Sequence, residues 1–382
     1  MPVNPGDILT MTLSILSKWL ESTGVVHFTI GNVVMIAVAF VLMYIGIVHK
    51  HEPFLLVPIA VGAILANIPN TGLMANDGLL RYFYTGVEKV VLPPLIFLGV
   101  GAMTDFGPLI ANPSVILFGA AAHIGIFVAL VGAKILGFSL PEAGAIGIIG
   151  GADGPMAIYV SSKLAPQLLG QVAVAAYSYM ALLPVVQPPI MRLLTTKKAR
   201  RTPMKQLRPV SRRERIFFPI LMIIVVNALL PPVAPLISMF MLGNLLKESG
   251  VVERLTHTAA GTMLDIVTIF LVTAIGATMG ADNFFNFRTL EIVVLGMIAF
   301  ATGTAGGVIA GDVAYWLSKG KINPLIGSAG IAAVPMAARV SHMVAFKENP
   351  RNLLVMHAMG PNIAGVFGTA VAGSIMITLL LH

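Results

Sequence analysis

Long apolar stretches that carry almost no charge recur along the whole chain, and no other feature of the sequence constrains the fold as strongly. They lie at 30–48 and near 54–68, 90–104, 108–133, 143–162, 164–191, 216–232, 233–246, 259–280, 290–311, 322–346 and 352–381. A bilayer interior offers no partner to an unpaired backbone group, so such stretches cross it as helices of roughly 20 residues. We therefore expect an all-α polytopic membrane protein, with room for roughly ten spans.

Composition excludes the main alternatives to a membrane protein. Charged residues are only 10% of the 382, whereas a soluble domain carries about 25%. A soluble enzyme is therefore excluded, and so is a nucleic-acid-binding domain in which the net charge of +8 would form a surface patch. There is no cysteine, hence no catalytic thiol or thiolate metal site. Residues 8–20 are too short and amphipathic to span, and predict an interfacial helix with Trp19 at the head-group level.

One hydrophilic loop, residues 192–215, holds ten of the 24 Lys and Arg and has Glu214 as its only acid. Cytoplasmic loops of membrane proteins concentrate positive charge, so we expect a solvated loop on the cytoplasmic side of the cell membrane. The same charges also suit docking of an acidic partner or of anionic lipid.

The basic loop separates two halves that resemble each other. Pro155-Met156-Ala157 and Val160-Ser161 of the first half match Pro335-Met336-Ala337 and Val340-Ser341 of the second. If the loop is inside and both distal ends are outside, each half crosses an odd number of times and the repeats are inverted, as in secondary transporters. We thus expect an N-terminal segment 1–25, repeat 1 at 26–191, the loop at 192–215 and repeat 2 at 216–382.

Asp153 is the most informative single residue, because a carboxylate at membrane depth is costly and needs a partner or a function. Neighbouring glycines and Pro155 predict a broken helix with free backbone carbonyls, an oxygen-rich site for a small hard cation. A glycine packing seam with a structurally paired aspartate is the alternative. Asn323 and Asn362 stand at two further Gly/Pro breaks, and a single charge with two amide oxygens favours Na⁺ over a divalent ion.

Arg339 also lies within an apolar run. It either neutralises a buried acid such as Asp153 or binds the carboxylate of an anionic substrate, for which a guanidinium is well suited. Tyr177 and Tyr179 follow the first break and either pack or line a site. No phosphate-binding loop appears, so ATP hydrolysis by this chain is not expected, and the histidines lack metal-ligand spacing.

Five motifs in combination resemble the β subunit of the sodium-pumping, biotin-dependent decarboxylases, whose members act on oxaloacetate, methylmalonyl-CoA, glutaconyl-CoA or malonate. The resemblance extends over nearly the whole chain. The motifs are GADGP at 151–155, AYSYMALLP at 176–184, INPLIGSAG at 322–330, VPMAARVS at 334–341 and MGPN at 359–362.

The resemblance implies the chemistry and the partners. A carboxyltransferase α subunit charges biotin on a carrier protein or domain, and the β subunit decarboxylates the carboxybiotin, consumes a proton and exports Na⁺. A small γ or δ membrane subunit and a homo-oligomer are also implied. Carboxybiotin then meets broken helices that form a mobile transport unit, held by a scaffold of the outer helices of each half.

The resemblance also assigns residue roles. It makes Asp153 the sodium-linked aspartate, Asn323 and Asn362 the sodium-site asparagines, Gly327 a functional glycine, and Tyr179 and Arg339 the functional tyrosine and arginine. The family commonly has a serine, linked to ion binding, where this chain has Ala332. We consider the nearby Ser328 as a residue that could take the place of that serine. A secondary Na⁺/organic-anion symporter or Na⁺/H⁺ antiporter is the main alternative, because it would use the same sodium site without chemistry. A channel or structural subunit is the other.

Overall fold

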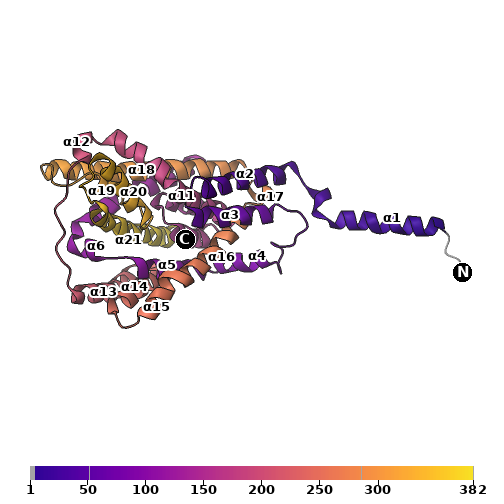
Figure 1. Cartoon of the computed structure of the whole chain (residues 1–382), viewed down its shortest axis with the longest axis horizontal. Helices are drawn as coiled ribbons and strands as arrows, with labels where there is room; N and C mark the ends of the chain where they lie inside the picture. Colours follow the sequence, from indigo (N-terminus) through magenta and orange to yellow (C-terminus); the bar gives the residue numbers. More distant parts are fainter. Residues whose placement is uncertain (1–4, 51, 285, 382) are drawn as a thin grey trace. The chain divides into compact units, whose positions relative to one another are not determined.

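The computed structural model describes residues 5–50, 52–284 and 286–381, and regular structure within them is entirely helical (Figure 1). The all-α expectation is thus confirmed. Six of the described helices are long and apolar enough to span a membrane, or seven if the bent pair Leu79–Glu88 and Leu92–Met103 is one span. They are Ile30–Ile47, Pro113–Ile135, Pro166–Leu194, Glu253–Ala277, Phe287–Leu317 and Val355–Leu380. This is fewer than the roughly ten allowed by length, because proline and glycine divide several apolar stretches into short helices.

The chain forms two compact units, and the smaller one comprises Met1–Thr85 and Val272–Asn286. Its α1 reaches away from α2 and α3 (Figure 1), and every described side chain from Met11 to Glu21 is exposed. The interfacial location predicted for residues 8–20 stays a prediction. Residues 1–4 of the predicted N-terminal segment 1–25 lie outside the described part. The helices are α1 (Pro5–Ser22), η1 (Gly24–His27), α2 (Ile30–Ile47), α3 (Pro53–Ala66), most of α4 (Leu79–Glu88), the end of α16 (Leu264–Ala277) and α17 (Ala281–Phe284).

The larger unit comprises Gly86–Leu271 and Phe287–His382. Its first part contains α5 (Leu92–Met103), α6 (Gly107–Ala111), η2 (Pro113–Val115), α7 (Ile116–Ala122), α8 (Ile124–Ile135), α9 (Leu140–Gly147), η3 (Ile148–Gly151), α10 (Gly154–Leu164), η4 (Pro166–Leu168), α11 (Leu169–Leu194) and α12 (Lys197–Arg200). Its second part contains α13 (Arg212–Leu229), η5 (Pro231–Val233), α14 (Ala234–Ser249), α15 (Glu253–Thr258), the π-helix η6 (Ala259–Met263), the start of α16, α18 (Phe287–Leu317), α19 (Leu325–Ser328), α20 (Met336–Glu348) and α21 (Val355–Leu380).

The same order of elements occurs on both sides of the basic loop. In the first half the chain passes through α8, the broken pair α9 and α10, and then the long α11. In the second half it passes through α18, the broken pair α19 and α20, and then the long α21. This order agrees with the internal duplication, whereas the inverted orientation of the repeats stays a prediction. The compact units do not follow the repeat boundaries, because each unit takes residues from both sides of the loop.

Close packing of helices depends on glycine at the contact points. A Cβ on Gly101 of α5 would lie 1.9 Å from the Phe240 carbonyl oxygen, and one on Gly243 of α14 would lie 2.0 Å from that of Leu98. Membrane helices associate through small residues of this kind, since lipid removes the hydrophobic drive that joins helices in water. Any side chain at either glycine would therefore push α5 and α14 apart.

Three helices begin with the same local signal, a capping box in which the N-cap hydroxyl and the third side chain exchange hydrogen bonds with the backbone. Thr29 with Asn32 starts α2, Ser139 with Glu142 starts α9, and Ser211 with Glu214 starts α13. The last of these marks the point where the basic loop ends and an apolar helix begins. The sequence thus carries a local signal for this boundary.

Candidate functional site

The first interrupted helix, which we call break 1, comprises residues 148–153 between α9 and α10. The 3-10 turn Ile148–Gly151 is followed by Ala152 in the left-handed region, at φ +56°. Asp153 then acts as the N-cap of α10, because its Oδ1 accepts a hydrogen bond of 3.0 Å from the Met156 backbone N–H. Pro155, in the first turn, needs no hydrogen-bond partner for its nitrogen. The carboxylate therefore stands where the helix restarts.

The second carboxylate oxygen of Asp153 has no such partner. The residue is 4% exposed, and its Oδ2 is buried without a hydrogen bond from any described residue. Arg339 does not neutralise it, since this arginine is exposed on α20 and forms no ion pair within the described chain. A buried charge is strongly unfavourable unless it is paired or bound to a cation. Break 1 thus presents an unsatisfied carboxylate oxygen to the interior.

The second interrupted helix, break 2, comprises residues 329–335 between α19 and α20. Asn362 of α21 holds its backbone, donating from Nδ2 to the carbonyl oxygens of Ala329, Ile331 and Ala333 at 3.1, 2.7 and 3.4 Å. Asn362 is fully buried, and its Oδ1 has no hydrogen-bond partner among the described residues. The amide therefore fixes break 2 with its nitrogen and leaves its oxygen unsatisfied.

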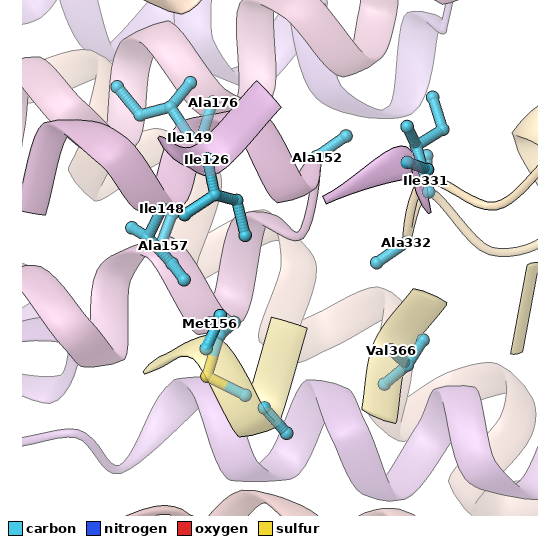
Figure 2. Packing of buried hydrophobic residues seen from close by; sticks show 14 of the residues in the cluster. Ile126, Ile148, Ile149, Ala152, Met156, Ala157, Ala176, Ile331, Ala332 and Val366 are labelled. Carbon is cyan, nitrogen blue, oxygen red and sulfur yellow. The ribbon is translucent and has the colours of Figure 1, made fainter. Parts of the chain in front are cut away.

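The two breaks meet each other. The Ala332 backbone N–H donates to the Gly151 carbonyl oxygen at 2.9 Å. Figure 2 shows Ala152 of break 1 directed toward Ile331 and Ala332 of break 2, within one buried cluster. Because Asp153 follows Gly151 by two residues and Asn362 binds the carbonyls on both sides of Ala332, the structure brings these two candidate residues to one junction.

Asn323 has a different set of contacts. Its Nδ2 donates to the backbone oxygens of Arg200 and Thr202, both at 2.9 Å, and its Oδ1 accepts from the Leu325 N–H at 3.0 Å. The side chain is fully buried. The amide is thus engaged at both ends and connects the basic loop to α19, unlike that of Asn362.

The basic loop is in part a packed element, which corrects the expectation that all of it is solvated. Arg200 is only 8% exposed and pairs with Glu348 at 3.0 Å. Asn349 donates to the Arg201 carbonyl oxygen at 3.1 Å, and Asn352 donates to that of Thr202 at 3.0 Å. We use the name loop clasp for residues 195–202 together with the side chains that bind them, which are Asn323, Glu348, Asn349 and Asn352. Net charge did not reveal it, because its bonds mostly join side-chain amides to backbone oxygens.

Gly327 and Ser328 occupy the short helix α19. A Cβ on Gly327 would lie 1.9 Å from the Gly307 carbonyl oxygen of α18, so only glycine permits this approach. The Ser328 Oγ donates to the Leu325 carbonyl oxygen and lies 2.7 Å from the Ser341 Oγ. Gln187, which the sequence analysis missed, donates to the Ser328 carbonyl oxygen at 2.7 Å, and its own Oε1 is buried without a partner in the described chain.

Tyr177 and Tyr179 lie on opposite sides of α11, as expected for helical residues two apart. A Cβ on Gly154 would lie 2.6 Å from the Tyr177 ring, and the Tyr177 hydroxyl is buried without a partner among the described residues. The Tyr179 hydroxyl instead donates to the Val293 carbonyl oxygen of α18. Tyr177 therefore packs against Gly154, the first residue after break 1, whereas Tyr179 attaches α11 to α18.

A buried histidine behind break 1 was also missed from the sequence, where it lacked metal-ligand spacing. His123 bonds to the Thr369 Oγ1 through Nε2 at 2.8 Å and to the Gly119 carbonyl oxygen through Nδ1. Thr369 in turn packs on Gly151, where an added Cβ would lie 2.8 Å from its side chain. This pair supports break 1 from the side of α21.

Several charged side chains form ion pairs and hydrogen bonds at the end of the basic loop, where α13 begins. Hydrogen bonds from the Arg208 guanidinium and from Ser211 lower the pKa of the Glu214 carboxyl to about 2. Arg215 pairs with Asp105 at 3.1 Å and with Glu248 at 3.8 Å. The acids near this end of the loop therefore fix arginines in place.

Two interrupted helices that meet around unsatisfied oxygen atoms are the architecture of an ion-transporting membrane protein. Residues 31–380 match the family model described as the Na⁺-transporting oxaloacetate decarboxylase β subunit. The chain belongs to this family of decarboxylase β subunits.

Curated relatives agree with this assignment over almost their whole length. The chain is 55% identical to the glutaconyl-CoA decarboxylase subunit β of Acidaminococcus fermentans, over 96% of this chain and 97% of that protein. It is 55% identical to the methylmalonyl-CoA decarboxylase subunit β of Veillonella parvula, over 94% and 96%. It is 48% identical to the oxaloacetate decarboxylase β chain of Haemophilus ducreyi, over 94% and 97%.

Proposed function

We propose that this chain decarboxylates carboxybiotin brought by a carrier protein or domain, and that it couples the reaction to Na⁺ export with consumption of a proton. The observation that carries the proposal is the junction of the two breaks, where Asp153 Oδ2 and Asn362 Oδ1 are both buried and unsatisfied within the described chain. Carboxylate, amide and backbone oxygens are the ligands that a hard cation prefers. One formal charge in this set suits a monovalent ion.

The roles of the individual residues follow from their contacts. Asp153 supplies the charge for Na⁺, and Asn362 supplies a neutral oxygen and positions the carbonyls of break 2. Asn323, Gly327 and Ser328, the other members of the sodium set predicted from sequence, shape break 2 from the side of α19. Ser328 would replace the serine that the family commonly has at the position of Ala332.

The reaction breaks the bond between the carboxyl carbon and the ring nitrogen of carboxybiotin. The electron pair stays on nitrogen, which takes up a proton as CO₂ leaves. Arg339 is suited to hold the carboxylate, because its exposed guanidinium has no partner in the described chain and charge-assisted bonds to carboxylates are strong. In this proposal Tyr179 borders the site that receives the carboxylated ring, and Asp153 or a water beside it supplies the proton.

Coupling requires that the ion site change access between its loaded and empty states. Moving one charge against 100 mV costs about 2.3 kcal/mol, so leakage through an always-open site would dissipate the gain. The breaks and the helices that carry them form the mobile unit in this proposal, and the remaining helices form the scaffold. The basic loop lies on the cytoplasmic side. The carboxyltransferase α subunit, a small γ or δ subunit and further copies of this chain complete the complex.

The experiment uses the purified chain in sodium-free liposomes, with a carboxylated biotin carrier added to the side that bears the basic loop. CO₂ release and uptake of radioactive Na⁺ are followed together. We expect release that requires Na⁺ and that drives uptake, while the uncarboxylated carrier gives neither. Na⁺ uptake down its gradient without any carrier, and without CO₂ release, would overturn the proposal in favour of a secondary transporter.

A further inference from the structure

A cavity of about 550 Å³ lies beside the basic loop, and no residue of break 1 or break 2 lines it. Its walls come from α6, from residues 203, 204 and 206–210 of the basic loop, from Arg215 of α13, and from the turn that leads into α21 together with the start of that helix. Its volume is within the range of small-molecule sites, about 300–1,000 Å³. Neither the sodium site nor the roles of Arg339 and Tyr179 accounts for it.

Three arginines line this cavity, and two of them already have partners. Arg208 donates to Glu214 at 2.8 Å and to the Ile110 carbonyl oxygen at 3.1 Å. Arg215 pairs with Asp105 and Glu248. The Arg351 guanidinium, by contrast, has no ion pair or hydrogen bond within the described chain. One positive charge in the cavity wall is therefore uncompensated.

The backbone that carries Arg351 is held in place even though its side chain is not. The Asn349 Oδ1 accepts from the Arg351 N–H at 3.2 Å, and Asn352 donates to the Thr202 carbonyl oxygen in the loop clasp. The guanidinium is thus presented from a fixed turn, which reduces the conformational cost of binding an anion.

A second polar group faces the same cavity. His357, in the first turn of α21, lines it and is only 9% exposed, yet no described residue hydrogen-bonds to its ring. Its ring nitrogens are not among the buried polar atoms that lack a partner in the described chain, so they remain accessible to a ligand or water in the cavity. The remaining lining is largely apolar, including Pro108, Leu353 and Met356. This combination matches a single carboxylate on a compact, mostly apolar body.

We propose that this cavity is the first binding site of the carboxylated biotin ring, with Arg351 as the partner of its carboxylate and His357 as a hydrogen-bond partner. This inference rests on the proposed function, because the carrier is the source of the ring. The cavity opens at the N-terminal end of α21, the helix that carries Asn362 at the breaks. The rise along this helix from His357 to Asn362 is about 7.5 Å, at roughly 1.5 Å per residue.

The test begins with binding, so that it does not depend on turnover. The full chain is placed in nanodiscs of phosphatidylcholine, and carboxylated and uncarboxylated carrier are bound to it in the cold without Na⁺. We expect the carboxylated carrier to bind more tightly. Arg351→Gln should weaken this binding roughly 10- to 100-fold, and Arg351→Lys should restore part of it. Arg254→Gln, which removes an exposed arginine of α15 outside the cavity, is the matched control and should change nothing.

Steady-state kinetics then separate this inference from the proposed function. Arg351→Gln and His357→Gln should raise KM for the carboxylated carrier while kcat stays within about twofold, because uniform binding is lost but chemistry elsewhere is not. Equal binding of both carriers, or an Arg351→Gln variant that binds as wild type does, would overturn the inference. If binding discriminates but wild type releases no CO₂, the proposed function fails instead. Native mass spectrometry tests for a lipid in the cavity. If wild type retains phosphatidylglycerol, Arg351→Gln loses it and KM is unchanged, the cavity binds lipid and the proposal is rejected.

Discussion

Break 1 restarts its helix with a side chain of its own, whereas break 2 depends on donors from other elements. In break 1, Asp153 caps α10 and keeps one carboxylate oxygen unsatisfied. In break 2, the Asn362 side chain of α21 donates to the carbonyl oxygens of every second residue from 329 to 333. Asn323 connects the turn before this break to the basic loop. The difference suggests a division of labour in which break 1 carries the charge and break 2 responds to its surroundings.

Asp153→Asn is the most severe way to test this division, and we expect the largest effect from it. The amide keeps an oxygen for the cap on α10, so the protein should fold, but the charge for Na⁺ is lost. Na⁺-dependent CO₂ release should fall to the level of protein-free liposomes. Asp282→Asn, at an exposed position of α17, is the control and should retain activity. Wild-type turnover by Asp153→Asn would remove break 1 from the ion site.

Asn362→Ala tests break 2 and should have the next largest effect. It removes an oxygen and three hydrogen bonds to carbonyls, and we expect the Na⁺ concentration for half-maximal CO₂ release to rise roughly 10- to 100-fold. Asn244→Ala is a matched control, because Asn244 is also fully buried, donates to a carbonyl and has an unpartnered Oδ1 in the described chain. An equal Na⁺ shift in both variants would mean that the effect is one of general stability.

Asn323→Ala separates the loop clasp from the ion site. Loss of two bonds to the backbone of Arg200 and Thr202 should loosen the loop, and trypsin should cleave after Arg200 or Arg201 faster than in wild type, by roughly 10-fold. Asn349→Ala removes one clasp bond and should accelerate cleavage less. If Asn323→Ala instead raises the Na⁺ concentration for half-maximal CO₂ release as much as Asn362→Ala does, and cleavage by trypsin is unchanged, the result would support the sequence-based role of Asn323 as a sodium ligand.

The smallest effect is expected at the boundary of the loop, from Glu214→Gln. The folded-state pKa of Glu214 is depressed from 4.5 to about 2, so its contribution to stability is complete above 4.5 and is lost as pH falls toward 2. The variant should unfold at a slightly lower temperature than wild type at pH 7, and the gap should narrow below pH 4.5. Glu253→Gln, which removes an exposed acid in the first turn of α15, is the matched control.

The sequence predicted the all-helical class and the break at Asp153 well, because these depend on short-range chemistry. The break expected at Asn362 was wrong, since Asn362 lies inside the continuous helix α21, and the break expected near Asn323 lies instead at residues 329–335. Apolar length specifies a membrane helix, and glycine and proline can interrupt it. They do not always do so, because α11 continues through Pro184, Pro188 and Pro189 and α21 continues through Pro361.

Asp153 was identifiable from its charge in an apolar run, and the run of Lys and Arg marked the basic loop. The number of spans was less predictable, since apolar stretches such as 143–162 contain two helices with a turn between them.

Tertiary structure alone decided which of these residues act together. Residue spacing gave Asn323 and Asn362 the same predicted role, but only the fold shows that one amide is used up by the loop clasp and the other keeps a free oxygen at the junction with Asp153. Gln187 and His123 had no distinguishing pattern, and Arg351 resembled any loop arginine until its cavity was seen. The physical reason is that hydrogen-bond satisfaction depends on partners far apart in the chain, and local sequence does not encode those partners.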